Sequence, residues 1–266
     1  MRLEISARSH VGKVRSKNED NLCVLGRILP EIKTENYSLE DGAALKKPAF
    51  LGVFDGMGGY ARGERASYIM AGLAARRWQE AGAAQELLLD ICREANLAVC
   101  EEMRGPDERY MGTTASMLYF RGEQYTLCNV GDSPVFLWRD GILTAIHQEQ
   151  TERATYERVT GKPADPKRKF RLTQNIGMFP EEIRIEPYCE SGRILPGDVF
   201  LICSDGITDM AEPERMIGIL RSGGNSAQIA AELEAAALEA GGKDNATVIC
   251  ARVLKEKSLW DRIFGR

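Results

Sequence analysis

The chain has 266 residues, of which 44% are hydrophobic and 28% charged, and its formal net charge is −4. This length suffices for a large hydrophobic core, and the slightly acidic charge gives no reason to expect nucleic acid binding. No apolar run approaches the ~20 residues of a transmembrane helix, and the short, charged N-terminal segment is unlike a signal peptide. We therefore expect a globular cytoplasmic protein with no transmembrane segment.

Cysteine and histidine usage argues against a zinc site. The seven cysteines form no Cys-x-x-Cys pair, and the only histidines are His10 and His147. We interpret the cysteines as reduced core residues of a cytosolic protein. Any metal site must then be built from carboxylates.

Hydrophobic patterning in the first third of the chain predicts strands before helices. Glu4 to His10 alternates apolar and polar residues as a strand does, and Leu22 to Leu25 is a short apolar run. Glu31 to Lys47 is polar without a clear period, which indicates a loop. Ala49 to Phe54 is continuously apolar and predicts a buried central strand. Two amphipathic helices are expected next, at Gly63 to Trp78 and Ala83 to Met103, the second ending at Gly105-Pro106.

The remainder of the chain is rich in expected strands. Gln148 to Arg171 is polar and predicts a helix followed by an excursion, and Ser226 to Ala240 predicts an alanine-rich helix that Gly241-Gly242 stops. The expected strands are Thr113 to Phe120, Tyr125 to Val130, Val135 to Trp138, Ile142 to Ala145, Ile183 to Tyr188, Asp198 to Cys203 and Ala246 to Val253. Because strands and helices do not alternate, we expect an α+β fold of mostly antiparallel sheets with helices on their outer faces.

One stretch, residues 50–59, organises the sequence. It reads Phe-Leu-Gly-Val-Phe-Asp-Gly-Met-Gly-Gly, an apolar run that ends in a single carboxylate, Asp55, beside three glycines. Such a strand delivers an acid to the edge of a sheet, where a carboxylate and a freed carbonyl would suit a hard cation. Taken alone, the stretch is equally compatible with an ordinary strand-turn-helix corner.

Three further aspartates repeat this pattern. Asp205 follows an apolar run, Asp132 follows another, and Asp244 immediately precedes the last expected strand. Each stands at a strand end beside glycine, so together they would form an acidic cluster that requires cations, Mg²⁺ or Mn²⁺. Two such ions could activate a water for displacement at phosphorus, and Arg15 could bind phosphate oxygens.

Six segments carry a resemblance to the protein phosphatase 2C family, the metal-dependent serine/threonine phosphatases, in its bacterial form. They occur in the family's order and span nearly the whole chain: Arg15-x-x-Asn-Glu-Asp20, Phe54-Asp-Gly-Met-Gly-Gly59, Gly112-Thr-Thr-Ala115, Val130-Gly-Asp-Ser133, Cys203-Ser-Asp-Gly-Ile-Thr-Asp209 and Lys243-Asp-Asn245. The resemblance implies a four-layer α-β-β-α sandwich over residues 1–254, with two metal ions at one end of its two sheets.

The resemblance also implies a role for each site residue. Asp55 would bridge two Mn²⁺ or Mg²⁺ ions, and the carbonyl of Gly56 would bind one of them. The other metal contacts would come from Asp205 and Asp244, from Glu19 and Asp20 directly or through water, and, at a possible third ion, from Asp132 with Asp205. Arg15 would bind the substrate phosphate, and Thr113 and Thr114 would support the site through their hydroxyl groups.

Other residues receive weaker assignments. Met57 stands where animal members of the family have a histidine, so the general acid is unassigned. We expect Met57 to be a turn residue lining the cleft, His147 to be a packing or solvated histidine, and Asp209 to be a helix cap or turn residue. Residues 255–266 form an amphipathic tail, which we interpret as a short docked helix or frayed end; a membrane-surface or partner-binding segment is the alternative.

The resemblance implies an enzyme that hydrolyses phosphoserine and phosphothreonine in proteins by direct attack of the water between the metals. Its partners would be phosphorylated proteins and a cognate Ser/Thr kinase, and we expect a monomer. Two alternatives remain: a non-catalytic phosphoprotein-binding homologue and a dedicated regulatory phosphatase of the sporulation or stress type. The segment from Gly161 to Lys169 is expected to govern substrate choice.

Overall fold

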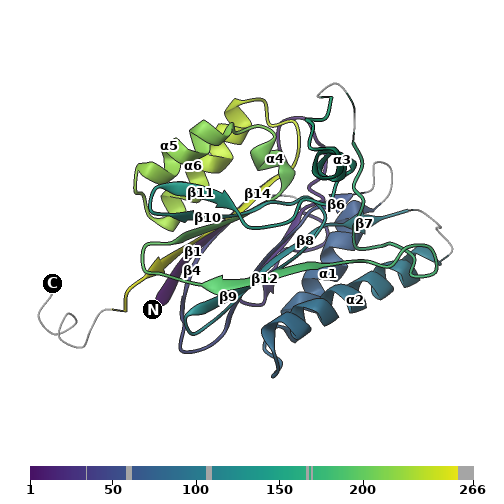
Figure 1. Ribbon diagram of the computed structural model, residues 1–266, viewed down its shortest axis with the longest axis horizontal. Helices are drawn as coiled ribbons and strands as arrows, with labels where there is room; N and C mark the ends of the chain where they lie inside the picture. Colours follow the sequence, from purple (N-terminus) through teal and green to yellow (C-terminus); the bar gives the residue numbers. More distant parts are fainter. Residues whose placement is uncertain (34, 58–61, 106–109, 166–167, 169, 257–266) are drawn as a thin grey trace, which may run out of the picture.

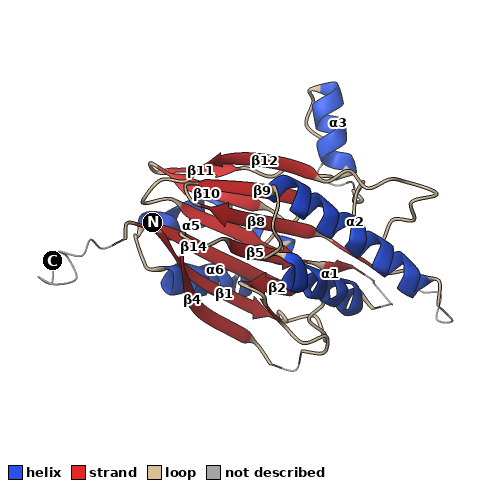
Figure 2. Ribbon diagram, turned by 90° about the horizontal axis from the view of Figure 1, so that it is seen from below, coloured by secondary structure: helices blue, strands red, loops and turns tan. Residues whose placement is uncertain are grey.

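The computed structural model describes residues 1–33, 35–57, 62–105, 110–165, 168 and 170–256. Two six-stranded sheets pack face to face, and helices cover both outer faces (Figures 1 and 2). Every strand pair within these sheets is antiparallel over the described residues. The expected α+β sandwich of four layers is therefore confirmed. In the part of the chain that the structure describes, no helix is long and apolar enough to cross a membrane.

The first sheet carries the last strand of the chain at its centre. Its strands lie in the order β11 (Ile142–Ala145), β10 (Val135–Arg139), β13 (Val199–Cys203), β14 (Ala246–Leu254), β1 (Arg2–His10) and β4 (Tyr37–Ala44). Cys203 at the end of β13 lies opposite Val248 near the start of β14. The segments that follow β13 and precede β14 therefore meet at one end of the sandwich.

The second sheet is centred on the apolar run found in the sequence. Its order is β12 (Tyr188–Arg193), β9 (Gln124–Val130), β8 (Ala115–Arg121), β5 (Ala49–Phe54), β2 (Asn21–Val24) and β3 (Arg27–Ile28). Just beyond the end of β5, the two-residue strands β6 (Gly56–Met57) and β7 (Gly112–Thr113) pair with each other.

Helices form the two outer layers. The second sheet is covered by α1 (Gly63–Arg77) and α2 (Ala84–Met103), and the first by α4 (Asp205–Thr208), α5 (Pro213–Arg221) and α6 (Ser226–Glu239). Helix α3 (Glu152–Thr160) stands clear of both layers at one end of the sandwich (Figure 2). It begins with the Thr151 hydroxyl accepting a hydrogen bond from the Ala154 N–H (3.0 Å) and ends at Gly161 with a φ of 65°.

Strand β5 is continuously apolar because both of its faces are covered. Phe50 and Phe54 pack beneath α1 and α2, whereas Leu51 and Val53 point into the core between the sheets. All four side chains are fully buried, each contributing about 1.5–3 kcal/mol. The strand is thereby fixed as a rigid support for Asp55, the residue that follows it.

Two sequence expectations were wrong. The polar segment Glu31 to Lys47 contains an eight-residue strand, β4, which pairs along β1. Its alternation was weak because β4 is an edge strand: Tyr37 and Leu39 pack toward the inter-sheet core while its other face is exposed. The strand expected at Ile183 to Tyr188 is instead β12, whose polar and glycine residues gave no strand pattern.

Two helices were not predicted from the sequence, the four-residue α4 and the longer α5. Helix α5 begins with Pro213 in its first turn and buries Met216, Ile219 and Leu220 on one face. Helix α6 begins at Ser226, the expected start, where Asn225 caps it and forms a reciprocal capping box with Gln228. Some earlier assignments fall on residues outside the described ones: Gly58, Gly59, Pro106, Pro166, part of the Gly161 to Lys169 segment, and residues 257–266 of the tail.

Candidate active site

Asp55 is held in place through its backbone at the end of β5. Its N–H donates to Thr114 Oγ1 (3.0 Å), and its carbonyl accepts from the Thr114 N–H and from Thr113 Oγ1 (both 2.9 Å). The Thr114 hydroxyl also contacts Ser133 Oγ at 2.6 Å, next to Asp132. The two threonines thus tie the Asp55 and Asp132 segments together and leave the Asp55 carboxylate free for other contacts.

Asp205 and Asp244 meet because β13 and β14 are neighbours. Asp205 opens α4 two residues after the end of β13, and Asp244 lies two residues before the start of β14, the strand that pairs with β13. A Cβ placed on Gly206 would lie 1.9 Å from the Asn245 carbonyl oxygen, so only glycine permits this approach. The glycine of this Asp-Gly pair, at the start of α4, is therefore a packing requirement of the site.

Asp20 is the most buried acid of the group, with 1% of its surface exposed. Its Oδ2 accepts hydrogen bonds from Ser204 Oγ (2.8 Å) and Thr247 Oγ1 (2.6 Å). Its Oδ1 is buried and has no hydrogen-bond partner among the described residues. A buried carboxylate oxygen without a partner is costly, so this atom has an unmet need for a donor or a cation.

The acids raise one another's pKa values. Burial, followed by the charges of Asp20, Asp205, Asp132 and Asp244, raises the pKa of Asp55 well above its ordinary value. Burial and then Asp132, Asp209 and Asp244 raise the pKa of Asp205 to about 8. Both effects show that the carboxylates lie within electrostatic reach of one another, with too little positive charge among them.

The outer members of the cluster behave similarly. Burial first, and Glu149 second, raises the pKa of Asp132 to about 6. Burial raises the pKa of Asp20 to about 6 although the hydroxyl groups of Thr247 and Ser204 lower it. Burial and the neighbouring Glu64 likewise raise the pKa of Glu19.

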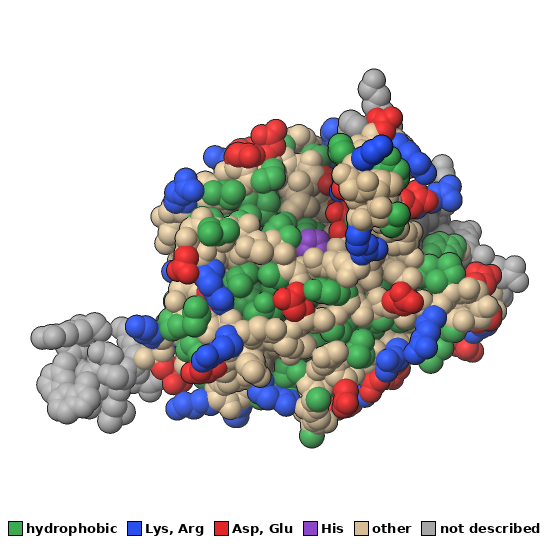
Figure 3. Space-filling view, in the orientation of Figure 1, with side chains coloured by type: hydrophobic (Ala, Val, Ile, Leu, Met, Phe, Trp, Pro, Cys, Tyr) green, Lys and Arg blue, Asp and Glu red, His purple; other side chains and the backbone are tan. Residues whose placement is uncertain are grey.

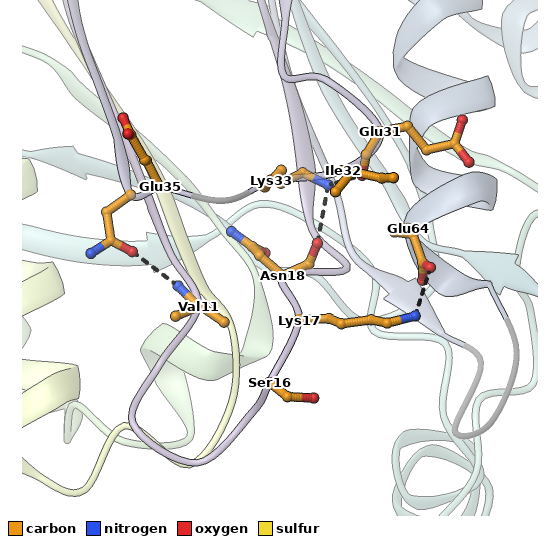
Figure 4. Close-up of a pocket in the computed structure, with 10 residues that line it drawn as sticks. Val11, Ser16, Lys17, Asn18, Glu31, Ile32, Lys33, Glu35 and Glu64 are labelled. Atoms are coloured by element: carbon orange, nitrogen blue, oxygen red, sulfur yellow. Dashed lines mark hydrogen bonds and ion pairs between the residues drawn. The ribbon is translucent and has the colours of Figure 1, made fainter.

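Arg15 and Glu19 approach the cluster from the loop between β1 and β2. Arg15 Nη2 donates to Asp244 Oδ2 (2.6 Å), and both side chains are partly exposed. The Glu19 backbone is pressed against Gly56, where an added Cβ would lie 2.4 Å from the Glu19 carbonyl oxygen. On the far side of this loop, Lys17 pairs with Glu64 of α1 at 3.1 Å (Figure 4).

The expected metal residues therefore gather at one end of the sandwich, although their oxygens do not surround a common point. Among the described residues, no three histidine, cysteine, aspartate or glutamate side chains are arranged as a metal-binding group. One reason is visible at Asp244, whose Oδ2 takes the Arg15 guanidinium. The donor set nevertheless fits Mg²⁺ or Mn²⁺, because it is all oxygen, strongly anionic and includes the unpartnered Asp20 Oδ1.

A cleft of about 600 Å³ opens from this cluster. Its lining combines acids from the site with basic and aromatic side chains: Asp132, Asp205, Asp209, Glu149, His147, Phe136, Phe170, Arg153 and Arg168, with Pro134, Thr151 and Thr208. The space-filling view shows acidic side chains gathered in a recess with basic side chains around it (Figure 3). The acid cluster is thus reachable from solvent through a groove whose walls are partly cationic.

Of the three weaker assignments, those of His147 and Asp209 agree with the structure and that of Met57 does not. His147 packs edge-on against Phe136 (ring centroids 6.1 Å apart), as a packing histidine does, and it also lines the cleft. Asp209 ends α4, its N–H donating to the Asp205 carbonyl at 2.7 Å, so the cap assignment is confirmed. Met57 is not a turn residue: it pairs with Gly112 in the short β6–β7 ladder.

The sequence analysis missed the residues that hold the site together. Asn245 accepts from the Glu19 N–H and donates to the carbonyls of Val11 and Lys17, each at 2.8 Å. This one side chain fixes both ends of the Arg15 loop. Asn245 is part of the Lys243-Asp-Asn245 motif, which was the one indication in the sequence that it belongs to the site. Its role could not be predicted, because it depends on contacts with residues more than 220 positions away.

Two hydroxyl residues play a similar part. Ser67 of α1 donates to the Glu19 carbonyl at 2.6 Å, and Thr247 donates to Asp20. Asn18 accepts from the Asp20 N–H (3.1 Å) and donates to Ser9 Oγ (2.9 Å). No sequence pattern distinguishes Ser67 or Thr247 from the many other hydroxyl residues of the chain.

The sequence profile of the protein phosphatase 2C family matches residues 9–246, so the site lies in a fold and sequence of that class. The chain belongs to the protein phosphatase 2C family. It is 32% identical over 95% of its length to the serine/threonine protein phosphatase PstP of Mycobacterium tuberculosis, of which it spans 45%. It is 28% identical over 96% of its length to the serine/threonine phosphatase Stp of Listeria innocua and spans 96% of that protein.

Solved structures agree with this assignment. The catalytic domain of PstP in complex with two manganese ions superimposes with a TM-score of 0.76 and 28% identity, covering 95% of this chain and all of that one. The two-sheet sandwich seen here is therefore the fold of a phosphatase 2C catalytic domain.

Proposed function

We propose that this protein is a Mn²⁺- or Mg²⁺-dependent phosphatase that removes phosphate from phosphoserine and phosphothreonine in cytoplasmic proteins. The main evidence is the group of mutually repelling carboxylates around Asp55, together with the buried Asp20 Oδ1, which has no hydrogen-bond partner among the described residues. Such a group is stable only when protonated or when it holds cations. The manganese complex of the related PstP domain supports bound cations over protonation.

The proposed metal residues are those that the resemblance to the family assigns, and they lie at one end of the sandwich. Asp55 would bridge two ions, with the Gly56 carbonyl on one side and with Asp205 and Asp244 on the other. Glu19 and Asp20 would bind through water or directly, and Asp132 with Asp205 would form a possible third position. When bound, two such ions supply an activated water between them and neutralise charge on the phosphoryl group.

The chain's own residues bind and orient the substrate in this proposal. Arg15 holds a carboxylate oxygen of Asp244 at 2.6 Å, and a phosphate offers the same guanidinium a similar pair of oxygens. The phosphorylated segment would lie in the 600 Å³ cleft, whose Arg153 and Arg168 attract anionic chains and whose Phe136 and Phe170 offer apolar contact. Asn245 and Ser67 keep the Arg15 loop in place by fixing its backbone.

The proposed catalytic unit is residues 1–254, acting as a monomer opposite a Ser/Thr kinase. The acids that the resemblance assigned to the metals are all present and gathered at one end, which supports catalysis over a purely phosphoprotein-binding role. No contact in the described residues favours a dedicated sporulation- or stress-type substrate.

Hydrolysis of a phosphothreonine peptide by the purified protein, in EDTA, Mg²⁺ or Mn²⁺, tests the proposal. We expect activity only with a divalent ion and at least ~10³-fold loss in Asp55→Asn. Asp90→Asn, which changes an exposed acid on α2, is the matched control and should retain full activity. Calorimetric titration of the same proteins with Mn²⁺ distinguishes a variant that no longer binds the metal from one that binds it but no longer hydrolyses the substrate. Tight Mn²⁺ binding without hydrolysis of any phosphopeptide would move the assignment to a binding protein.

A further inference from the structure

Three cysteines that are far apart in sequence meet at one edge of the second sheet. Cys128 of β9 lies directly opposite Cys189 of β12, and Cys92 of α2 brings its sulfur to 3.9 Å from that of Cys128. Figure 1 shows β12 beside β9 at this edge, and α2 packs against β9. The phosphatase site makes no use of these side chains, so the cluster needs a separate explanation.

We propose that Cys128 and Cys189 form a peroxide-sensitive thiol pair that closes to a disulfide across β9 and β12. Directly opposed residues of antiparallel strands have Cα atoms about 4.5 or 5.5 Å apart, and disulfides span about 4.4–6.8 Å. The register therefore already places the two Cα atoms within bonding range. Both side chains project from the same face of the sheet, because opposed residues share a face.

The two thiols differ in a way that assigns their roles. Cys128 and Cys92 are fully buried, whereas Cys189 is partly exposed on an edge strand. A hydrogen bond from Cys128 and the nearby positive charge of Arg93 lower the pKa of Cys189, while the contacts with Cys189 and Cys92 raise that of Cys128. Reactive thiols are accessible and close to positive charge, so Cys189 is the thiol that reacts with the oxidant first.

The reaction balances with a hydroperoxide as the oxidant. The Cys189 thiolate attacks one peroxide oxygen, the O–O bond breaks, and the departing oxygen takes a proton to leave as water or an alcohol. Cys189 is now a sulfenic acid. The Cys128 thiol then attacks the Cys189 sulfur, an S–S bond forms, and the hydroxyl leaves as water with the Cys128 proton. Two thiols are oxidised by two electrons, and the peroxide is reduced.

The backbone is suited to the small movement that closure needs. Strand β12 has a neighbour on one side only, and most of its side chains are partly or fully exposed. It can therefore approach β9 without rearranging a packed layer. Cys203 and Cys250 are also neighbouring core cysteines, but both are fully buried beneath α5 and α6 and offer no such access.

Peptide mapping of the folded protein after mild hydrogen peroxide, with thiol counting in denaturant, tests the pair. We expect loss of two of the seven thiols and a single crosslinked peptide joining Cys128 to Cys189. Cys189→Ala should lose no thiols, and Cys128→Ala should accumulate a sulfenic acid at Cys189 that a dimedone probe captures. Cys250→Ala, the matched control, should still form the bond.

The wild-type map decides the matter even if a variant folds poorly. Seven intact thiols after treatment would overturn the proposal. A bond between Cys92 and Cys128 in place of the expected one, or direct conversion of Cys189 to sulfinic acid with Cys128 still reduced, would do the same. The result is independent of the proposed phosphatase activity, because no substrate or metal ion takes part.

Discussion

Strand β13 carries an aspartate at each end, and the protein neutralises only one of them. Asp198, just before the strand, is 1% exposed and receives Arg139 Nε (2.8 Å), Arg139 Nη2 (2.7 Å) and the Leu195 N–H (2.6 Å). Asp205, just after the strand, makes no ion pair among the described residues. Its neighbours are other acids, which with burial raise its pKa to about 8.

The difference separates a structural end of the sandwich from a functional one. A buried carboxylate is stable in a fold when a guanidinium satisfies both of its oxygens, as at Asp198. At the other end of β13, the side chains near Asp205 are the acids Asp55, Asp132 and Asp20, and not an arginine or lysine that would pair with it. Arg15 pairs with Asp244 there, but no basic side chain pairs with Asp205 among the described residues, so the remaining positive charge must come from solution, as protons or as metal ions.

The largest expected effect is on metal-dependent activity at the Asp205 end. Asp205→Asn should weaken Mn²⁺ binding and lower phosphopeptide hydrolysis by about 10³-fold, or roughly 4 kcal/mol in the activation free energy. Calorimetric Mn²⁺ titration and steady-state rates measure the two effects separately. Asp198→Asn is the comparison and should keep its Mn²⁺ affinity. Equal losses in both variants would show that the two ends are not distinct.

The next effect concerns the free energy of unfolding, where Asp198→Asn should be the more damaging of the two variants. Asp198→Asn should lower the free energy of unfolding by about 3 kcal/mol, because it leaves Arg139 beside an amide in a largely buried setting. Asp205→Asn should raise it in EDTA, because one of several repelling charges is removed. Urea unfolding of both proteins in EDTA gives the comparison. Destabilisation by Asp205→Asn without metal would contradict it.

Most of the fold was predictable because its helices and buried strands carry strong periodic patterns. The bounds of β5 and α2 were found to within one residue, since each buries a continuous or striped apolar surface. β4 and β12 were missed or misplaced because both are edge strands, where half of each strand faces solvent and the hydrophobic signal is diluted.

The acids of the site were visible in the sequence, but their supports were not. Asp55 and Asp205 each precede a glycine close to the end of a strand, and Asp244 follows the Gly241-Gly242 pair by two residues, which is a local pattern visible in the sequence. The role of Asn245 depends on tertiary contacts to residues 11–19. The three-cysteine cluster was invisible for the same reason, since it depends on the register of β12 against β9.

A pH series without metal sharpens the contrast between the two ends. The pKa of Asp205 is raised from 3.8 to about 8 in the fold, so the folded state holds more protons than the unfolded state between these values. Its contribution is fully present below pH 4 and is lost as the pH rises through 8. In EDTA, the free energy of unfolding should therefore fall between pH 5.5 and 8, by up to about 1.4 kcal/mol per pH unit for one proton.

Mn²⁺ should reverse that trend. Deprotonated carboxylates are the metal-binding form, so stability in saturating Mn²⁺ should rise with pH over the same interval. Asp205→Asn should flatten the fall in EDTA, whereas Asp198→Asn should retain it. A slope in EDTA that is independent of Asp205 would place the titrating group elsewhere.

The smallest expected effect is at Ser204, the residue between β13 and Asp205. Its hydroxyl donates to Asp20 Oδ2 (2.8 Å) and accepts from the Thr247 N–H (3.0 Å), so it joins the structural strand to the functional acid. Ser204→Ala should cost about 1 kcal/mol of stability in EDTA. It should also weaken Mn²⁺ binding by about tenfold, because a residue that orients a ligand acid typically contributes this much.

The control for Ser204 is another hydroxyl with a purely structural bond. Ser222 donates to the Ile219 carbonyl at 2.7 Å at the end of α5, far from the acids in the fold. Ser222→Ala should cost a similar amount of stability and leave Mn²⁺ affinity unchanged. If both serine variants lose stability equally and neither changes Mn²⁺ affinity, the Ser204 hydroxyl only joins two strands. A loss of Mn²⁺ affinity in Ser204→Ala alone would instead show that the Ser204 hydroxyl, through Asp20, takes part in metal binding.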